Sequence, residues 1–382
     1  MLLTEDQRMV RDSVRDYVQD HIAPKAAAWD KSHAFPAAEL KGLAELGCYG
    51  IAVPEQYGGA GLDYTSLAII LEEIAAGDGG VSTVISVNNC PVCSILMSFA
   101  NEQQKRDWLV PLARGEKLGA FALTEAHAGS DASSLRTTAT LDGDHYVLNG
   151  AKQFITSGKN ADVAIVMAVT DKNAGKRGIT AFLVPTKTPG YTVARIEDKL
   201  GQHCSDTAAL LFENCRIPAS LRIGDEGAGY KIALAGLEGG RIGIAAQSVG
   251  MARAAFAAAL AYANQRESFG KPIFEHQAVQ FKLADMATQI EAARQLIHHA
   301  ASLKDVGQPC LTQAAMAKLF ASEMAERICS DAIQIHGGYG YVSDFPVERI
   351  YRDVRVCQIY EGTSDIQKIL IGRGLASGTY DA

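Results

Sequence analysis

The hydrophobic residues of this sequence repeat with two different periods, and the order of these periods limits what the chain can fold into. Up to about Arg114, and again from about Tyr230, apolar residues recur at helical spacing. Between Leu118 and Gly227 they form short β-branched runs separated by Gly, Pro, Asn or Asp, which is typical of strands. Because no helical pattern separates these runs, they predict an antiparallel barrel or sandwich between two helical regions.

Three helices are predicted in the first region. Thr4 and Gln7 form a capping-box pattern, and the helix that they begin is expected to end at Pro24. A second helix is predicted from about Pro36 to Gly47, and a third over 65–76.

The middle region begins with a hairpin pattern at Asp142-Gly143, and Asn149-Gly150 indicates a further turn. Further strands are predicted over Val163–Val169, Ile179–Val184, Tyr191–Ile196 and Ala208–Phe212.

Three long helical patterns follow, over Ile242–Asn264, Gln277–Leu303 and Leu311–Ile335, and their short connections indicate a bundle. The predicted class is a multidomain α+β protein. Its domains are an N-terminal helical domain (1–117), a central antiparallel β domain (118–228) and a C-terminal helical bundle (229–382).

Charge and hydropathy exclude several classes of protein. The 382 residues include 36 Lys and Arg and 43 Asp and Glu, a net charge of −7, which argues against a nucleic-acid binder. The longest uncharged stretch, 79–101, contains many polar residues, so no membrane span is expected. Charges within the first twelve residues argue against a signal peptide. A cytoplasmic location is therefore expected, or the mitochondrial matrix for a processed eukaryotic chain.

The eight cysteines are scattered, as in proteins of reducing compartments. Cys90 and Cys93 have C-x-x-C spacing, but a zinc site needs a second pair of similar spacing, which the sequence lacks. Two buried thiols are the simpler interpretation, and no metal site is predicted.

Three segments are candidates for chemistry, and each has a simpler alternative. Glu361 stands on a short loop before a helix for which Ser364 and Gln367 form a capping box, so it is either a general base or an acidic helix N-terminus. The glycines of 334–341 either end a helix or expose amides to a cofactor. Arg266, at the end of a helix, suits the helix dipole or a pyrophosphate.

Seven motifs in this order resemble the acyl-CoA dehydrogenase family over essentially the whole chain. They are Phe121-Ala-Leu-Thr-Glu125, Ala128-Gly-Ser-Asp131, Phe154-Ile-Thr156, Arg266-Glu-Ser-Phe-Gly-Lys271, Gln334-Ile-His-Gly-Gly338, Tyr351-Arg-Asp353 and Ile359-Tyr-Glu-Gly-Thr-Ser364. The resemblance implies the three-domain fold above with a four-helix C-terminal domain, noncovalent FAD and a homotetramer. It also implies that electrons pass to electron-transferring flavoprotein.

The resemblance assigns roles to individual residues. Glu361 is the implied base that removes the α-proton of an acyl-CoA thioester, while hydride leaves the β-carbon for the flavin and a trans-2-enoyl-CoA forms. The implied FAD contacts are Phe121, Leu123, Thr124, Ser130, Phe154, Ile155, Thr156 and Thr363 in the same subunit, with Arg266, Phe269, Gln277, Gln334, Gly337 and Gly338 reaching the FAD of a neighbouring subunit. The implied substrate contacts are Ser130, Glu238, Arg241, Tyr360, Gly362 and Arg373.

The sequence departs from the family pattern at several positions. The aromatic residue beside the flavin is Phe154 where Trp is common, Asp365 replaces a common Gln, and the change at Ala126-His127 has no interpretation. In isovaleryl-type members the base lies at the position of Gly240, which supports Glu361 as the base here.

The substrate resemblance is to short-chain and short-branched-chain members, through Gly239-Gly240-Arg241 and Ser86-Val87-Asn88-Asn89. Ser82 stands where glutaryl-type members carry an Arg. The alternatives are an acyl-CoA oxidase, a nitroalkane oxidase, in which the base is Asp, or a noncatalytic helical adapter.

Overall fold

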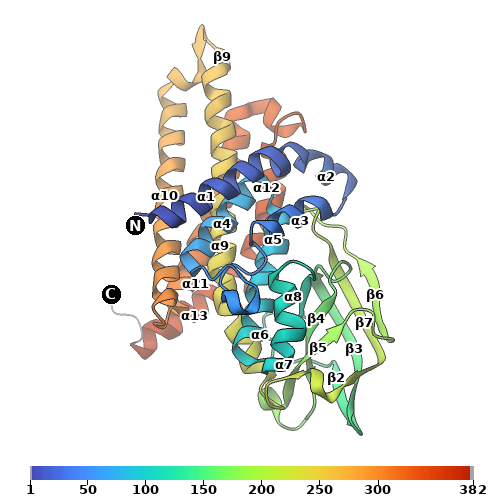
Figure 1. The fold of residues 1–382 in the computed structure, drawn as a ribbon. Helices are drawn as coiled ribbons and strands as arrows, with labels where there is room; N and C mark the ends of the chain where they lie inside the picture. Colours follow the sequence, from blue (N-terminus) through green and yellow to red (C-terminus); the bar gives the residue numbers. More distant parts are fainter. Residues whose placement is uncertain (1, 379–382) are drawn as a thin grey trace.

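The computed structural model describes residues 2–378. Along the chain, helices come first, then the strands of one sheet, then helices again. In Figure 1 the sheet lies beside the lower part of the helices. The N-terminal helices are α1 (Glu5–Tyr17), α2 (Ala26–Ser32), α3 (Ala37–Glu45), α4 (Tyr64–Gly77), α5 (Gly79–Val87), α6 (Ser94–Phe99), α7 (Glu102–Gln104) and α8 (Val110–Ala113).

The predicted capping box at Thr4 and Gln7 is present, but Pro24 does not end the helical path. A π-helical turn (Val18–Ile22) and a 3₁₀ turn (Ala23–Lys25) lead directly into α2. Proline is tolerated here because it lies in the first turn of the 3₁₀ segment, where its missing N–H has no helical partner to lose.

The sheet has eight strands in the order β6-β7-β3-β2-β4-β5-β8, and β1 pairs with β4. The strands are β1 (Gly119–Ala122), β2 (Thr138–Asp142), β3 (His145–Thr156), β4 (Val163–Val169), β5 (Ile179–Pro185), β6 (Tyr191–Ile196), β7 (Thr207–Pro218) and β8 (Arg222–Ile223). Most pairs are antiparallel as expected, but β1 and β2 both pair with β4 in parallel.

The hairpin predicted at Asp142-Gly143 is confirmed, whereas the turn predicted at Asn149-Gly150 is wrong. These two residues lie inside β3, where the register with β7 shifts between Leu148 and Gly150. A β-carbon at Gly150 would lie 2.6 Å from Cα of Thr137, so this glycine allows a close approach of the chain and does not reverse it.

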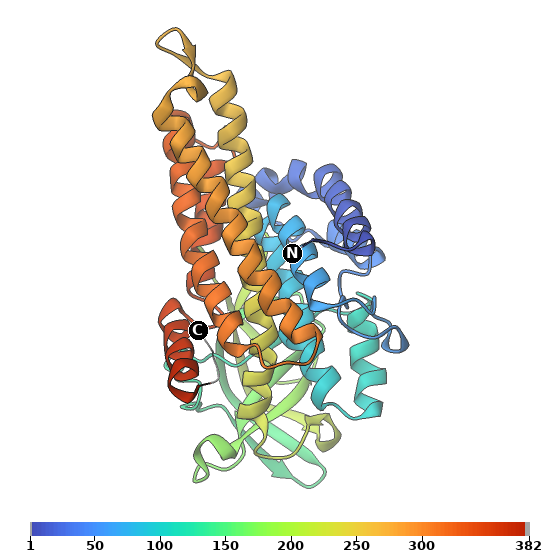
Figure 2. The same cartoon turned by 90° about the vertical axis from the view of Figure 1, so that its left-hand side faces the viewer.

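The C-terminal region contains α9 (Gly229–Gln265), α10 (Gln277–Asp305), α11 (Leu311–His336), α12 (Val347–Val354) and α13 (Ser364–Ser377), with the small hairpin of β9 (Glu267–Ser268) and β10 (Lys271–Pro272) after α9. The helices α9, α10 and α11 run side by side, and α13 packs against α11 (Figure 2). Helix α9 begins 13 residues before the predicted start at Ile242 because its early glycines are buried against other elements, and packing outweighs their low helix propensity.

Helix α4 is the central element of the helical core and packs on both α1 and α9. It carries two adjacent buried carboxylates: Glu73 pairs with Arg15 and Arg253, and Glu72 pairs with Arg294. These ion pairs link α4 to α1, α9 and α10, so the N-terminal helices and the bundle form one core.

Two helical stretches, Gly79–Phe99 and Gly229–Gln265, are long and apolar enough to cross a membrane by length and composition alone. The polar residues of the first stretch argue against a span. Within the fold, 89% of the apolar window of the first and 61% of that of the second is buried, as in the core helices of many globular proteins.

Candidate active site

Glu361 lies on a turn between a 3₁₀ segment (Arg355–Gln358) and α13. Its φ is +51° and that of Gly362 is +95°, so the chain makes a left-handed turn at both residues. Left-handed backbone at a non-glycine residue is unfavourable and persists where the surroundings hold it, often at a functional site.

The cap of α13 differs from the sequence prediction. Thr363 is the N-cap, because its Oγ1 accepts a hydrogen bond from the N–H of Ile366 at 3.4 Å. Gln367 does not complete a capping box with Ser364. Its Nε2 turns back to donate to the carbonyl oxygen of Gly362 at 2.8 Å.

The carboxylate of Glu361 is directed at helix α9. Its Oε2 is buried and accepts no hydrogen bond from the described residues. A β-carbon at Gly240 would lie 2.0 Å from that oxygen, so the missing side chain of Gly240 provides the space for the carboxylate. Burial raises the pKa of Glu361 to about 7, although the positive charges of Lys318 and Arg241 oppose this rise.

Arg241 is 4% exposed, and its Nε and Nη1 have no hydrogen-bond partner among the described residues. Burial lowers the pKa of this guanidinium, while the charges of Glu361 and Glu238 raise it. Glu238 itself pairs with Lys304 at 3.1 Å and accepts a hydrogen bond from the thiol of Cys310. The substrate residues expected on α9 therefore lie in one charged cluster with the expected base.

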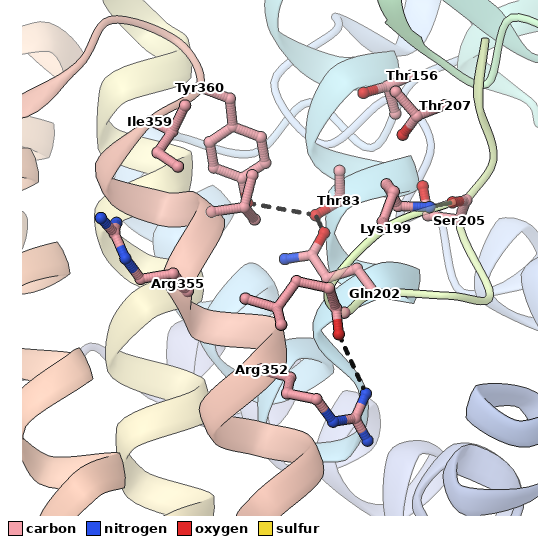
Figure 3. A pocket seen from close by; sticks show the side chains of 13 residues that line it. Thr83, Thr156, Lys199, Gln202, Ser205, Thr207, Arg352, Arg355, Ile359 and Tyr360 are labelled. Atoms are coloured by element: carbon pink, nitrogen blue, oxygen red, sulfur yellow. Dashed lines mark hydrogen bonds between the residues drawn. The ribbon is translucent and has the colours of Figure 1, made fainter. Parts of the chain in front are cut away.

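A cavity of about 210 Å³ lies beside this turn, between the sheet, α5 and the C-terminal helices (Figure 3). Its lining residues are Thr83, Thr156, Lys199, Leu200, Gly201, Gln202, Ser205, Thr207, Arg352, Arg355, Val356, Ile359 and Tyr360. Among the predicted site residues, Thr156 and Tyr360 line it.

Hydrogen bonds connect the walls of this cavity. The hydroxyl of Tyr360 donates to Oε1 of Gln247 at 3.0 Å, and Nε2 of Gln247 donates to Oγ1 of Thr83 at 2.5 Å. Thr83 in turn donates to Oε1 of Gln202 at 2.7 Å. No sequence motif marks Thr83, Gln202 or Gln247, because their partners lie far away along the chain.

The other predicted residues near the sheet lie in β1, in the loop after it, or at the end of β3. Ile155 is buried, Phe154 is 62% exposed with φ +59°, and a register shift with β7 lies between Lys152 and Ile155. Phe121 and Leu123 belong to the apolar core beneath the sheet, whereas Ser130 is on the surface.

Glu125 and Lys152 form a buried ion pair that sequence reasoning missed. Their oxygen and nitrogen lie 2.8 Å apart, and the ammonium also donates to the carbonyl oxygen of Leu123 at 3.0 Å. Glu125 accepts further hydrogen bonds from the N–H groups of Arg136 and Thr137. The pair fixes the loop that carries Leu123 and Thr124, the residues expected at a cofactor.

A second group of predicted residues lies at the far end of the bundle, away from the sheet, near the β9 hairpin (Figure 1). The guanidinium of Arg266 lies 6.0 Å from the ring centre of Tyr339, so the ends of α9 and α11 meet there. Phe269 is 95% exposed, and Gln277, Gln334, Gly337 and Gly338 are also exposed. Arg373 is exposed on α13.

Cys90 and Cys93 are free and buried, as the simpler interpretation predicted, and burial raises the pKa of Cys90 to about 11. Within residues 2–378 no three His, Cys, Asp or Glu side chains form a group that could hold a metal ion.

Three sequence profiles of one family match almost the entire chain. They are the N-terminal, middle and C-terminal domains of acyl-CoA dehydrogenase, and they match residues 4–116, 120–215 and 227–376. The chain belongs to the acyl-CoA dehydrogenase family. It is therefore an oxidoreductase that introduces a double bond between Cα and Cβ of an acyl-CoA, and the family's enzymes are FAD-dependent flavoproteins.

Relatives of this family member are similar over nearly their full lengths. The mitochondrial short-chain specific acyl-CoA dehydrogenase of Homo sapiens is 48% identical over 97% of this chain and 90% of its own. The butyryl-CoA dehydrogenase structure from Megasphaera elsdenii is 44% identical, with a TM-score of 0.95 over 98% of this chain and 99% of its own. A chain in the structure of the electron transferring flavoprotein of Acidaminococcus fermentans is 47% identical, with a TM-score of 0.96 over 98% and 99%.

The cavity suits the cofactor of this family. Ser205 lines it and is 2% exposed, and its Oγ has no hydrogen-bond partner within the described chain. The hydroxyls of Thr156 and Thr207 and the ring of Tyr360 also line it. Hydroxyl donors beside an aromatic wall fit a flat ring with polar edges, as in a flavin.

Proposed function

We propose that this enzyme oxidises short-chain acyl-CoA thioesters and that Glu361 is its catalytic base. One observation carries the proposal: Oε2 of Glu361 is buried, has no hydrogen-bond partner within the described residues and lies against Gly240, whose missing side chain leaves room for the carboxylate. A pKa of about 7 leaves a large fraction of this carboxyl ionised at neutral pH and makes it a stronger base than an exposed glutamate.

The residues around Glu361 define the steps that the protein performs. The carboxylate takes the α-proton, while the backbone amide of Glu361 is proposed to polarise the thioester carbonyl by donating to its oxygen. Bound FAD supplies the two-electron acceptor for the hydride of the β-carbon. We propose that Thr156, Thr207, Ser205 and Tyr360 hold its ring system, with Leu123, Thr124, Phe154 and Thr363 nearby.

Crowding beside the carboxylate supports a short acyl chain. A β-carbon at Gly239 would lie 3.0 Å from Cε1 of Tyr64 and 3.1 Å from Sγ of Cys90. One turn further along α9, a β-carbon at Gly243 would lie 2.9 Å from Oγ of Ser86. The side chains that pack on α9 next to the proposed base therefore leave no room for a side chain at either glycine, and we infer a short acyl site, as in the short-chain relatives.

The proposal includes two partners. A second copy of the chain is expected at the end of the bundle that carries Arg266 and Phe269, within a homotetramer. Electron-transferring flavoprotein is proposed as the electron acceptor, and the structural relative from the Acidaminococcus flavoprotein supports this choice. A cytoplasmic location belongs to the same proposal and is tested by cell fractionation.

Replacement of the base tests the proposal. Glu361→Gln keeps the shape of the side chain and removes the proton acceptor. Because a general base contributes about 10²–10⁴-fold, we expect flavin reduction by butyryl-CoA to slow by at least this factor, with FAD still bound. Anaerobic stopped-flow bleaching of the flavin measures this rate. Bleaching near the wild-type rate would remove Glu361 from the mechanism.

A further inference from the structure

Helix α11 contains a lysine that has no contact with solvent. Lys318 is 0% exposed, and its Nζ donates a hydrogen bond to the carbonyl oxygen of Gly362 at 2.8 Å. A buried ammonium is unfavourable unless hydrogen bonds or charges compensate it. Burial lowers the pKa of Lys318 to about 8, so the side chain is still mostly protonated at neutral pH.

The acceptor of this hydrogen bond belongs to the turn of the proposed base. Nε2 of Gln367, which is fully buried on α13, donates to the same Gly362 oxygen at 2.8 Å and to the carbonyl oxygen of Glu361 at 3.4 Å. Two buried side chains from two helices therefore hold the backbone of a left-handed turn. Because such backbone persists only where its surroundings fix it, these donors determine where the Glu361 carboxylate and amide lie.

The charge of Lys318 acts on the same carboxylate. Lys318 on α11 and Arg241 on α9 are the two cations that oppose the burial effect on Glu361, and the effect of Lys318 is the larger. The other titratable groups that face this cluster are Cys90, Cys310, Cys357, Glu238, Glu323 and Lys304. Lys304 pairs with Glu238 at 3.1 Å, so its charge is directed at that carboxylate. Of the two cations that act on Glu361, removal of Lys318 leaves only Arg241.

We propose that Lys318 is a positioning residue for the dehydrogenation: its hydrogen bond to Gly362 fixes the turn of Glu361, and its charge keeps the carboxylate ionised at working pH. This inference rests on the proposed role of Glu361 as the base. It assigns a function to a lysine that no sequence motif marked.

The test replaces Lys318 and measures the pH dependence of kcat/KM for butyryl-CoA in the FAD-loaded enzyme. Lys318→Met keeps the length of the side chain but removes the donor and the charge. Loss of the cation raises the pKa of the Glu361 carboxyl, so we expect the acidic limb of the profile to move to higher pH by about one unit. At a pH below the limb, kcat/KM then falls about tenfold, whereas at pH 9 it falls less. Lys318→Arg keeps the charge and should restore the position of the limb.

Gln367→Leu is the matched variant, because it removes the other donor to Gly362 without changing a charge. It should lower kcat while the acidic limb stays in place. If Lys318→Met and Gln367→Leu give the same profile, or if the limb does not move in Lys318→Met, the charge role is wrong. If Lys318→Met does not fold, the comparison of Lys318→Gln with Lys318→Arg decides the question in the same way.

Thermal unfolding gives a readout that does not depend on activity. At pH 8, Glu361→Gln should raise the melting temperature more in the Lys318→Met background than in the wild type, because the ionised carboxylate has lost its main counter-charge there. Equal increments in both backgrounds would contradict the interaction. The Glu361→Gln variant separates failure of this inference from failure of the proposed function. If only the role of Lys318 is wrong, Glu361→Gln is still inactive. If Glu361 is not the base, Glu361→Gln retains activity.

Discussion

At the scale of single residues, an absent side chain is as important to the site as the proposed base itself. Gly240 lies within a helix, where glycine is normally unfavourable by about 1 kcal/mol relative to alanine. Its hydrogen occupies the position where a β-carbon would lie 2.0 Å from Oε2 of Glu361. Helix propensity alone favours alanine at this position. Alanine is excluded because its β-carbon would clash with the Glu361 carboxylate.

We therefore predict that Gly240→Ala lowers flavin reduction by butyryl-CoA by about 10²-fold, since a misplacement of about 1 Å has an effect of this size. The measurement is the rate of anaerobic flavin bleaching, together with the melting temperature. Gly372→Ala is the control: Gly372 also lies in a helix, but a β-carbon there would meet no described residue beyond its own helix within 4 Å. Equal rates in the two variants would show that the carboxylate is not held against Gly240.

At the scale of elements, the tip of the bundle carries aromatic side chains that are strongly exposed among the described residues. Phe269 is 95% and Tyr341 is 86% exposed, and both lie where α9 and α11 end. Exposed aromatic side chains beside an arginine are typical of an interface. This arrangement fits the proposal that Arg266 contacts the FAD of a neighbouring subunit.

If Arg266 donates to the cofactor of a neighbouring subunit, loss of FAD and loss of the oligomer are linked. Arg266→Ala should then release FAD on dilution at protein concentrations where the wild type retains it, and added FAD should restore the melting temperature. Flavin fluorescence of the ultrafiltrate measures the released cofactor. Lys282→Ala, which removes an ion pair between α10 and Asp331 on α11, is the control. Unchanged retention of FAD in Arg266→Ala would contradict the assignment.

At the scale of the whole molecule, the proposed site exists because three parts of the chain meet. The cavity takes Thr83 from α5, Thr156 and Thr207 from the sheet, and Tyr360 from the C-terminal region. On α5, Ser82 is fully buried, and its Oγ donates to the carbonyl oxygen of Leu71 at 3.1 Å. If Ser82 corresponds to the Arg of glutaryl-type members, as the sequence resemblance implies, this position supplies no cation here.

This arrangement predicts the substrate range. The value of kcat/KM should be highest with butyryl-, isobutyryl- or 2-methylbutyryl-CoA, since one methylene in a fitted pocket changes it by about 10–200-fold. Glutaryl-CoA should be a very poor substrate because its second carboxylate would lose hydration without gaining a counter-charge. Steady-state assays with electron-transferring flavoprotein as acceptor decide the matter. A maximum at octanoyl-CoA, or efficient turnover of glutaryl-CoA, would refute the short pocket while leaving the family assignment intact.

The sequence by itself determined the order of helices, strands and helices, because each period of hydrophobic residues reports directly on local backbone geometry. It also determined the family and pointed to Glu361, because short motifs keep their order along the chain. The wrong predictions from the sequence concerned the ends of single elements. Pro24 and Asn149-Gly150 have the residue types of helix ends and turns, yet packing around them continues the helical path in one case and the strand in the other.

Only the tertiary structure decided how the proposed base, Glu361, is held. Lys318 lies 44 residues from Gly362 in sequence, Gln247 lies 113 residues from Tyr360, and Lys152 lies 27 residues from Glu125. A buried polar side chain must find its hydrogen-bond partner wherever the fold brings one, so its partner has no fixed spacing in the sequence. Periodicity and motifs describe neighbours along the chain, whereas these contacts arise only after the helices and the sheet have packed together.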